Sequence, residues 1–141
     1  MAKRRCIFTI SLTLVAFLLL CGSAATANAQ EKKSFPIRNI PPFDAQMLVR
    51  DRTDLVVVDV RTEKERSRAA IPGSIHLEMS EIFRGNYALQ QDTPVLLYCA
   101  VGGRSYAAAK WLRGRGFLEI YNLDGGIEAW QKNGFDVIQG E

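Results

Sequence analysis

The stretch Val95-Leu-Leu-Tyr-Cys-Ala-Val-Gly-Gly-Arg-Ser105 indicates the fold most directly. It begins with apolar and aromatic residues, as a strand buried on both faces does, so a strand is predicted over Thr93–Cys99. Two glycines follow, and Arg104–Arg115 then has the spacing of an amphipathic helix, with Ala107, Ala108, Trp111 and Leu112 on its apolar face. A buried strand that passes through a short glycine loop into a helix is typical of an α/β protein.

The same alternation runs along the rest of the chain. Strands are predicted over 35–40, 54–60, 74–77, 93–99 and 118–123, and helices over 43–50, 62–69, 80–83, 104–115 and 127–132. The short connections predict one α/β domain, with a mainly parallel central sheet and helices on both faces. Asp124-Gly125-Gly126 is predicted to be a turn that starts the last helix, and Trp130 to be a core residue.

The first 29 residues have the pattern of a secretory signal peptide. Lys3, Arg4 and Arg5 precede a mostly apolar run, and Ala27-Asn28-Ala29 has small residues where a signal peptidase reads them. Cleavage near Ala29 leaves residues 30–141 as the mature domain, which we expect to be periplasmic or secreted. A lipoprotein signal that ends at Cys21 is the alternative, although the bulky Leu20 disfavours it.

Charge argues against two classes of partner. The chain has 18 Lys and Arg and 15 Asp and Glu, and the predicted leader holds three of the basic residues and none of the acidic ones. The mature part is therefore balanced in charge, which gives no support for binding to nucleic acid or, once the leader is removed, to an anionic membrane.

Cys99 is the only cysteine that remains after cleavage, because Cys6 and Cys21 lie in the leader. An internal disulfide is then excluded, and the thiol is either a buried core residue or a functional group. The loop that follows favours function. Unpaired backbone N–H groups from Val101 to Ser105, the helix dipole and Arg104 all stabilise a thiolate, so the pKa of Cys99 is predicted to fall.

Four segments in this order resemble the rhodanese (thiosulfate sulfurtransferase) domains. They are Val58-Asp-Val-Arg61, Ile71-Pro-Gly73, the loop from Cys99 to Ser105, and Leu123-Asp-Gly-Gly-Ile-Glu-Ala-Trp130. The resemblance implies a parallel sheet flanked by helices, a persulfide carried on Cys99 and an oxyanion-binding arginine at Arg61. The chain departs from the family pattern at Ala69-Ala70, where Gly-His is common, and at Ala100 and Val101, where strong thiosulfate users often have basic residues.

The chemistry agrees with this resemblance. A thiolate can attack the outer sulfur of thiosulfate and expel sulfite, and a thiol or cyanide, with a protein thiol as a further candidate acceptor, can then collect the sulfur. The backbone amides and the helix start can hold an anionic persulfide, so neither a metal nor another cofactor is expected. The only histidine, His76, is not required and is predicted to bond locally at a strand end.

Each predicted site residue also has a structural interpretation. Arg61 either binds substrate or pairs with Glu65 at the surface, and Arg104 either binds an anion or covers the domain with its stem. Asp59 is predicted to orient Arg61 or a loop amide. Gly102 and Gly103 are expected to let the backbone turn tightly and approach a ligand, beside Val101 and Ser105.

Two other functions remain open. Cysteine phosphatases and arsenate reductases also bind an oxyanion between a cysteine and an arginine, but with five intervening residues, whereas only Ala100 to Gly103 lie between Cys99 and Arg104. The smaller loop suits a single sulfur atom. The other alternative is a non-catalytic persulfide or redox carrier that delivers sulfur to a partner.

Overall fold

The computed structural model describes residues 35–139. The predicted leader, its cleavage site and Cys21 lie outside these residues. The strands are β1 (Arg38–Ile40), β2 (Val56–Asp59), β3 (Ile75–His76), β4 (Val95–Tyr98) and β5 (Ile120–Leu123). The helices are α2 (Pro42–Asp51), α3 (Glu63–Arg66), α4 (Met79–Arg84), α5 (Gly103–Gly114) and α6 (Gly126–Lys132).

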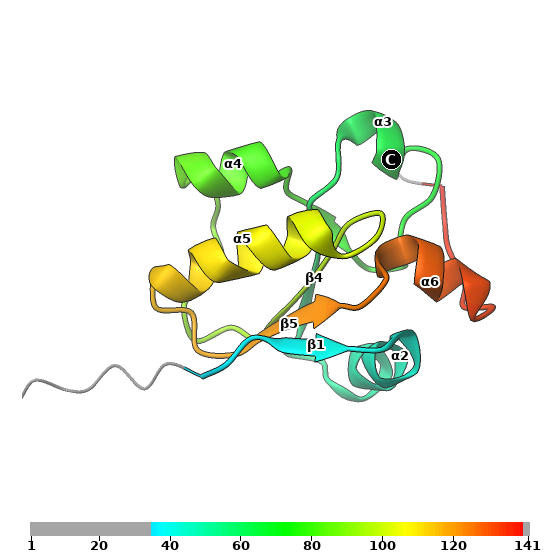
Figure 1. Ribbon diagram of the computed structural model, residues 1–141, viewed down its shortest axis with the longest axis horizontal. Helices are drawn as coiled ribbons and strands as arrows, with labels where there is room; N and C mark the ends of the chain where they lie inside the picture. Colours follow the sequence, from blue (N-terminus) through cyan, green and yellow to red (C-terminus); the bar gives the residue numbers. More distant parts are fainter. Residues whose placement is uncertain (1–34, 140–141) are drawn as a thin grey trace, which may run out of the picture. The chain divides into compact units, whose positions relative to one another are not determined.

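The five strands form one parallel sheet in the order β1-β5-β4-β2-β3. This confirms the predicted α/β fold class with a parallel central sheet, and β1 lies at one edge of it. Two helices, α4 and α5, lie on one side of the sheet, and α2 and α6 lie on the other (Figure 1). Because all strands are parallel, their carboxyl ends share one rim, which is where ligands bind in such folds.

Each face of the sheet has its own core. The face toward α4 and α5 buries Val58, Val95, Leu97, Ile82 and Leu112, among others. The opposite face packs Val57, Leu96 and Leu123 on Ala45 of α2 and on Ile127 and Trp130 of α6. Trp130 is 4% exposed, so its predicted core position is confirmed.

The predicted apolar face of α5 is partly wrong. The buried residues are Ser105, Ala108, Ala109 and Leu112, while Trp111 is about one third exposed. The indole ring packs on Phe83 of α4 at 5.1 Å between ring centroids and donates a hydrogen bond to the Ile82 carbonyl. The core side of α5 therefore lies over the small residues, which let the helix approach the sheet closely.

Segments beyond the predicted elements also pair. Ala70 and Ile138 exchange two backbone hydrogen bonds, of 2.7 and 2.9 Å, in an isolated antiparallel bridge. This bridge attaches the end of the described chain beside the Ile71-Pro72-Gly73 segment. No helix in residues 35–139 is both long enough and apolar enough to cross a membrane.

Candidate active site

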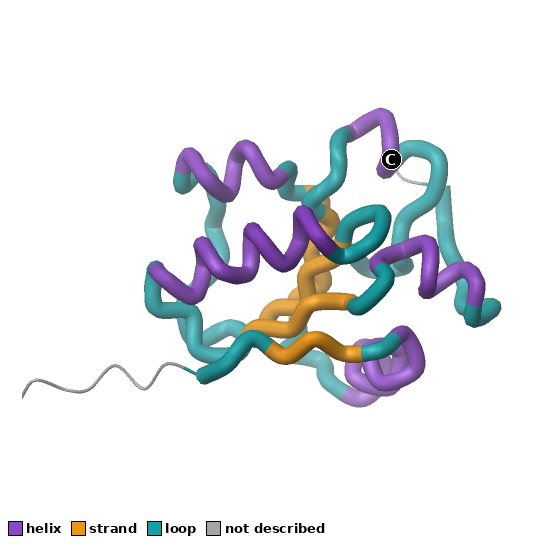
Figure 2. The backbone as a smooth tube through the Cα atoms, viewed as in Figure 1, coloured by secondary structure: helices purple, strands orange, loops and turns teal. Residues whose placement is uncertain are grey.

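The loop between β4 and α5 carries the predicted nucleophile. Cys99 directly follows β4, and α5 begins at Gly103, so four residues make the whole connection. The loop lies at the carboxyl rim of the sheet, beside the turn that precedes α6 (Figure 2). Cys99 is only 1% exposed, which restricts access to its sulfur.

Hydrogen-bond donors surround this sulfur. The Gly102 backbone N–H donates to Cys99 Sγ at 3.1 Å, and the Ser105 Oγ lies 3.5 Å from it. Burial by itself raises the pKa of Cys99, but the Ser105 hydroxyl and the amides of Ser105, Val101 and Gly102 outweigh burial and leave the pKa lowered. The predicted fall in the thiol pKa is therefore seen, and hydrogen bonding is its cause.

The backbone of the loop is fixed by the start of α6. The amides of Ile127 and Glu128 donate to the carbonyls of Cys99 and Ala100 at 2.9 and 3.2 Å. Gly126 has a φ of +58°, and a Cβ there would lie 2.4 Å from each of these carbonyl oxygens. The predicted turn and helix start at Asp124-Gly125-Gly126 is confirmed, and the structure adds that Gly126 brings α6 against the loop.

The two loop glycines differ. Gly102 has a φ of +96°, and a Cβ there would lie 3.1 Å from the Leu123 carbonyl oxygen, so both its conformation and its surroundings favour glycine. Gly103 has neither a positive φ nor a crowded Cβ position, so the predicted need for a tight turn is wrong there. Close approach of a ligand at Gly103 stays a prediction. Val101 is 61% exposed at the loop surface.

Asp59 holds Arg61, as the sequence predicted. Arg61 Nε and Nη2 donate to the two Asp59 carboxylate oxygens at 2.9 and 2.6 Å, and the Arg61 backbone N–H donates to Asp59 Oδ1 at 3.0 Å. Burial lowers the pKa of Arg61, and the bonds to Asp59 more than compensate, so that pKa is raised. The pair is buried, and the interpretation of Arg61 as a surface partner of Glu65 is wrong.

The rest of the Arg61 guanidinium binds backbone. Nη2 donates to the Ala69 carbonyl at 2.6 Å, and Nη1 donates to the Glu65 carbonyl at 3.4 Å. Four of the five N–H groups of the guanidinium thus have internal partners. Arg61 clamps the segment after α3 to the end of β2, and one N–H is left for an external anion.

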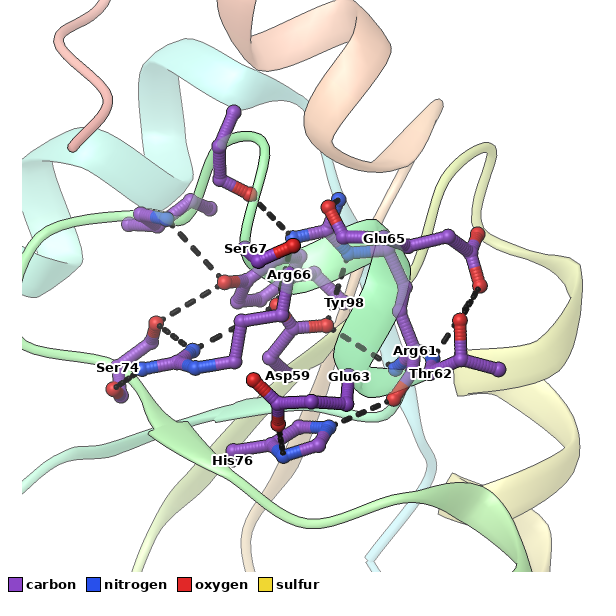
Figure 3. Close-up of polar contacts among 12 residues, drawn as sticks. Asp59, Arg61, Thr62, Glu63, Glu65, Arg66, Ser67, Ser74, His76 and Tyr98 are labelled. Carbon is purple, nitrogen blue, oxygen red and sulfur yellow. Dashed lines mark hydrogen bonds and ion pairs between the residues drawn. The ribbon is translucent and has the colours of Figure 1, made fainter. Parts of the chain in front are cut away.

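A polar cluster continues from this clamp under α3 (Figure 3). The Tyr98 hydroxyl bonds to Ser74 Oγ at 2.9 Å and accepts the Ile71 N–H at 3.2 Å, and Arg66 donates to Ser74 and lies 3.6 Å from Asp59. Burial raises the pKa of Tyr98, so its hydroxyl remains a neutral partner in this cluster.

The clamp and the thiol emerge on opposite faces of the sheet. Asp59 and Tyr98 are register partners, and Tyr98 belongs to the core beneath α2 and α6. Cys99 belongs to the other core, beneath α4 and α5. The sequence correctly placed Cys99, Asp59 and Arg61 at one rim, but alternation along the strands separates the thiol from the Asp59–Arg61 pair.

Arg104 has a carboxylate partner that the sequence did not indicate. Its Nη1 and Nη2 donate to Glu65 Oε2 and Oε1 at 2.9 and 2.5 Å, which joins α5 to α3. The bonds from Arg104 lower the pKa of Glu65 to about 2, so Glu65 is charged at neutral pH. The sequence offers Arg61 as a partner for Glu65 but not Arg104, since charge spacing within one segment cannot show a pairing across 39 residues.

His76 bonds locally, as predicted. Its Nε2 lies 2.8 Å from the Arg61 carbonyl oxygen, and its Nδ1 lies 2.9 Å from Glu63 Oε2. Within residues 35–139 the structure has no group of three or more His, Cys, Asp or Glu side chains that could hold a metal ion. The absence of a cofactor stays a prediction.

An open pocket beside the loop contains a second residue that sequence reasoning missed. Its lining includes Arg61, Arg68 and Ala100. Arg68 is exposed, and it makes no side-chain hydrogen bond or ion pair with any residue that the structure describes. It is therefore a cation available to an anion that reaches this side of the loop.

Comparisons with known proteins agree with this geometry. Residues 45–133 match the rhodanese-like domain family. The chain belongs to that family. A sulfurtransferase from Allochromatium vinosum is 35% identical over 91 residues, which cover 64% of this chain and 85% of that protein. The thiosulfate sulfurtransferase GlpE of Pseudomonas savastanoi pv. phaseolicola is 36% identical over 94 residues, covering 67% and 87%.

Solved structures share the fold. A rhodanese-related protein from Thermoplasma volcanium is 29% identical, with a TM-score of 0.65 over 72% of this chain and 98% of its own. A Rhodopseudomonas palustris protein described as a possible tyrosine phosphatase is 28% identical, with a TM-score of 0.67 over 72% and 85%. The family and the sulfurtransferase relatives together support a sulfurtransferase activity in general terms.

Proposed function

We propose that this rhodanese moves a sulfane sulfur from thiosulfate, or a similar small anionic donor, to a thiophilic acceptor through a persulfide on Cys99. The Cys99 thiolate attacks the outer sulfur of the donor, the sulfur–sulfur bond breaks, and sulfite leaves with the electron pair. An acceptor thiolate or cyanide then attacks the outer persulfide sulfur and releases the Cys99 thiolate. Atoms and charge balance without a metal or an added oxidant.

The observation that carries this proposal is the hydrogen-bonded surroundings of the sulfur. Gly102 N–H and the Ser105 hydroxyl already face Cys99 Sγ, and they favour its anionic form. The helix start adds the positive end of its dipole. An anionic persulfide needs the same donors, so the loop that lowers the thiol pKa also stabilises the intermediate.

The donor is expected to be small. Cys99 is 1% exposed, and the side chains that follow it, Ala100 and Val101, are uncharged. The cations near the loop are Arg104, which is paired with Glu65, Arg61, which is paired with Asp59, and the exposed Arg68. The predicted roles of Arg61, Arg104, Val101, Gly102, Gly103 and Ser105 in substrate binding remain part of the proposal.

Two alternatives are distinguished by turnover. A persulfide carrier would accept sulfur and release it to a protein thiol without rapid turnover of a small acceptor. A phosphatase or arsenate reductase would process an oxyanion instead, as the description of the Rhodopseudomonas palustris protein suggests for that chain. The loop of four residues between Cys99 and Arg104 favours sulfur over a phosphate-sized group.

We also propose that the protein is exported. The basic start, the apolar run and Ala27-Asn28-Ala29 support a leader cleaved near Ala29. Expression of the full chain with its native start, followed by fractionation and N-terminal sequencing, tests this. A mature protein that begins at Gln30 supports it, whereas a start at Cys21 would favour lipoprotein processing.

Intact-mass spectrometry tests the persulfide. Incubation of residues 30–141 with thiosulfate should add the mass of one sulfur atom, because Cys99 has no other cysteine in that segment with which to form a disulfide. Cyanide or a small thiol should remove the added mass. Cys99→Ser should remain folded and gain no sulfur.

A donor screen completes the test. An unchanged mass with thiosulfate and with other sulfane donors, although the thiol titrates, would contradict both the sulfurtransferase and the carrier. Hydrolysis of an aryl phosphate in the same screen would then favour the phosphatase alternative.

A further inference from the structure

Arg104 is in an unfavourable position for a cation. It lies in the first turn of α5, which begins at Gly103, where the helix dipole is positive and the backbone N–H groups point outward. The sequence suggested that such a cation binds an external anion. In the structure the anion is internal, because the Glu65 carboxylate accepts two hydrogen bonds from the Arg104 guanidinium.

Glu65 is itself held in place. Its Oε2 accepts the Thr62 backbone N–H at 3.2 Å and the Thr62 hydroxyl at 2.8 Å, and the same oxygen accepts a hydrogen bond from Arg104. In Figure 3 the Glu65 side chain extends away from the Asp59–Arg61 pair, toward the ribbon of α5. The carboxylate is therefore a fixed point, set by α3, to which Arg104 is attached.

The ion pair contributes more through orientation than through stability. The two side chains are 37% and 31% exposed, and pairs with such exposure contribute little to folding. A mobile arginine, however, loses rotamer entropy when it binds an anion, and an arginine that is already fixed does not. Because Glu65 engages only Nη1 and Nη2, other N–H groups of Arg104 remain available.

The other anion near Arg104 is the thiolate. Bonds from Glu65 raise the pKa of Arg104 most strongly, and the Cys99 thiolate raises it further. The geometry agrees with this. Ser105, which follows Arg104 in the first turn of α5, has its hydroxyl 3.5 Å from Cys99 Sγ, and Glu65, which holds the guanidinium, lines the same pocket as Ala100 of the loop. Of the other charged groups at this rim, Asp59 and Arg61 pair with each other on the opposite face of the sheet, and Arg68 and Glu128 line the open pocket beside the loop.

We propose that Glu65 is a positioning residue, whose carboxylate fixes the Arg104 guanidinium beside Cys99 so that this cation stabilises the anionic sulfur and the anionic donor. The part that concerns the donor rests on the proposed sulfur transfer. The part that concerns the thiolate does not, because the reactivity of Cys99 toward an alkylating agent can be measured without any sulfur donor.

Two substitutions of Glu65 separate positioning from simple charge repulsion. Glu65→Ala releases Arg104, and the thiolate loses a fixed cation, so the midpoint of the pH profile for alkylation by iodoacetamide should rise by about half to one unit. Glu65→Gln keeps an oxygen acceptor for Arg104 and removes a negative charge, so its midpoint should lie at or below that of the wild type. If the Glu65 carboxylate acted only by repelling the Cys99 thiolate, both substitutions would lower the midpoint. A lowered midpoint for Glu65→Ala would therefore overturn the proposal.

A double-mutant cycle tests whether Glu65 acts through Arg104. Arg104→Ala should raise the midpoint, and adding Glu65→Ala to it should then lower the midpoint or leave it unchanged, because the carboxylate has become an unpaired negative charge. If the two effects simply add, Glu65 does not act through Arg104. Glu63→Ala is the matched control, since Glu63 is also on α3 but pairs with His76.

The KM for thiosulfate provides the second measurement. Glu65→Ala should raise it by about threefold to tenfold, with a smaller change in kcat, because a cation that binds the ground state and the transition state alike contributes uniform binding. Circular dichroism confirms that each variant is folded. If Glu65→Ala is not, Glu65→Asp gives the answer: its shorter side chain keeps the negative charge but draws the carboxylate away from Arg104, so the midpoint should rise, whereas repulsion alone predicts no rise. A protein that transfers sulfur from neither thiosulfate nor any other sulfane donor would refute the proposed function, whereas an unmoved alkylation profile of Glu65→Ala would refute the positioning role.

Discussion

Replacing Arg61 by alanine should destabilise the protein strongly, because it leaves Asp59 buried without its cation. Asp59 is 0% exposed and Arg61 is 5% exposed, and the pair shares two hydrogen bonds of 2.6 and 2.9 Å. Breaking one partner out of a buried ion pair costs about 3–5 kcal/mol. That is a large part of the roughly 5–15 kcal/mol by which a domain of ordinary stability is folded.

Urea denaturation followed by tryptophan fluorescence measures this cost. With an unfolding slope of roughly 1–3 kcal/mol per molar urea, the midpoint should fall by about 1–5 M, or about 2 M at the middle of both ranges. Arg50→Ala is the matched control, because Arg50 makes the same kind of two-point contact with Asp51 at the surface, where both side chains are more than half exposed. The control should leave the midpoint unchanged.

A second variant tests the cause. The double variant carries Arg61→Met and Asp59→Asn. It removes both buried charges, and the amide oxygen of the introduced asparagine can still accept the backbone N–H of residue 61. Its free energy of unfolding should therefore fall less than that of Arg61→Ala alone. If Arg61→Ala is no less stable than Arg50→Ala, the clamp does not hold the fold. A stable Arg61→Ala protein with a raised KM for thiosulfate would instead favour substrate binding by Arg61.

Three further predictions concern the loop and its supports. Gly126→Ala should displace the loop or unfold the domain, because its Cβ would overlap the carbonyls of Cys99 and Ala100. Gly134→Ala is the control, since Gly134 has a positive φ of +78° but open space around it. In thermal melts the control should lose only about 1–2 kcal/mol of unfolding free energy. Ser105→Ala should move the midpoint of iodoacetamide alkylation upward, since the hydroxyl is among the groups that lower the pKa of Cys99, and an unmoved midpoint would contradict that role. The pKa of Glu65 is lowered from 4.5 to about 2, so its contribution to stability is present above pH 4.5 and is lost as the pH falls toward 2. In acid titrations, Glu65→Gln should therefore lose less unfolding free energy than the wild type between pH 4.5 and 2.

Access to the sulfur can be examined with reagents of different size. Because Cys99 is 1% exposed, a bulky aromatic disulfide reagent should react at least about tenfold more slowly than iodoacetamide, after each rate is corrected for the reactivity of a small free thiol. Equal corrected rates would show that the sulfur is open to large acceptors.

The sequence by itself was sufficient for the order and type of the elements and for the position of the nucleophile. The buried strands around Val58 and Leu97 are nearly continuous apolar runs, which is a local signal, and parallel connection follows from the helices between them. Cys99 could be placed at the rim for the same reason, because a residue that ends a parallel strand lies at its carboxyl edge.

Side-chain partners from distant segments could not be predicted, because they depend on distances between parts of the chain that are far apart in the sequence. Glu65 reaches Arg104 across 39 residues, and the start of α6 holds the carbonyls of Cys99 and Ala100. Neither contact leaves a periodic or compositional pattern. Gly126 was recognised only as a turn residue, since its closeness to the loop exists only after α6 has packed.

The face of the sheet on which each group emerges was also decided by the tertiary structure. Alternation along a strand sends Tyr98 and Cys99 to opposite sides, and the parallel register with β2 then puts Asp59 on the side of Tyr98. A sequence shows that Arg61 and Cys99 share a rim. Only the register of the folded sheet shows that the Asp59–Arg61 pair lies across from the thiol, and only the folded chain shows that Glu65 of α3 holds Arg104.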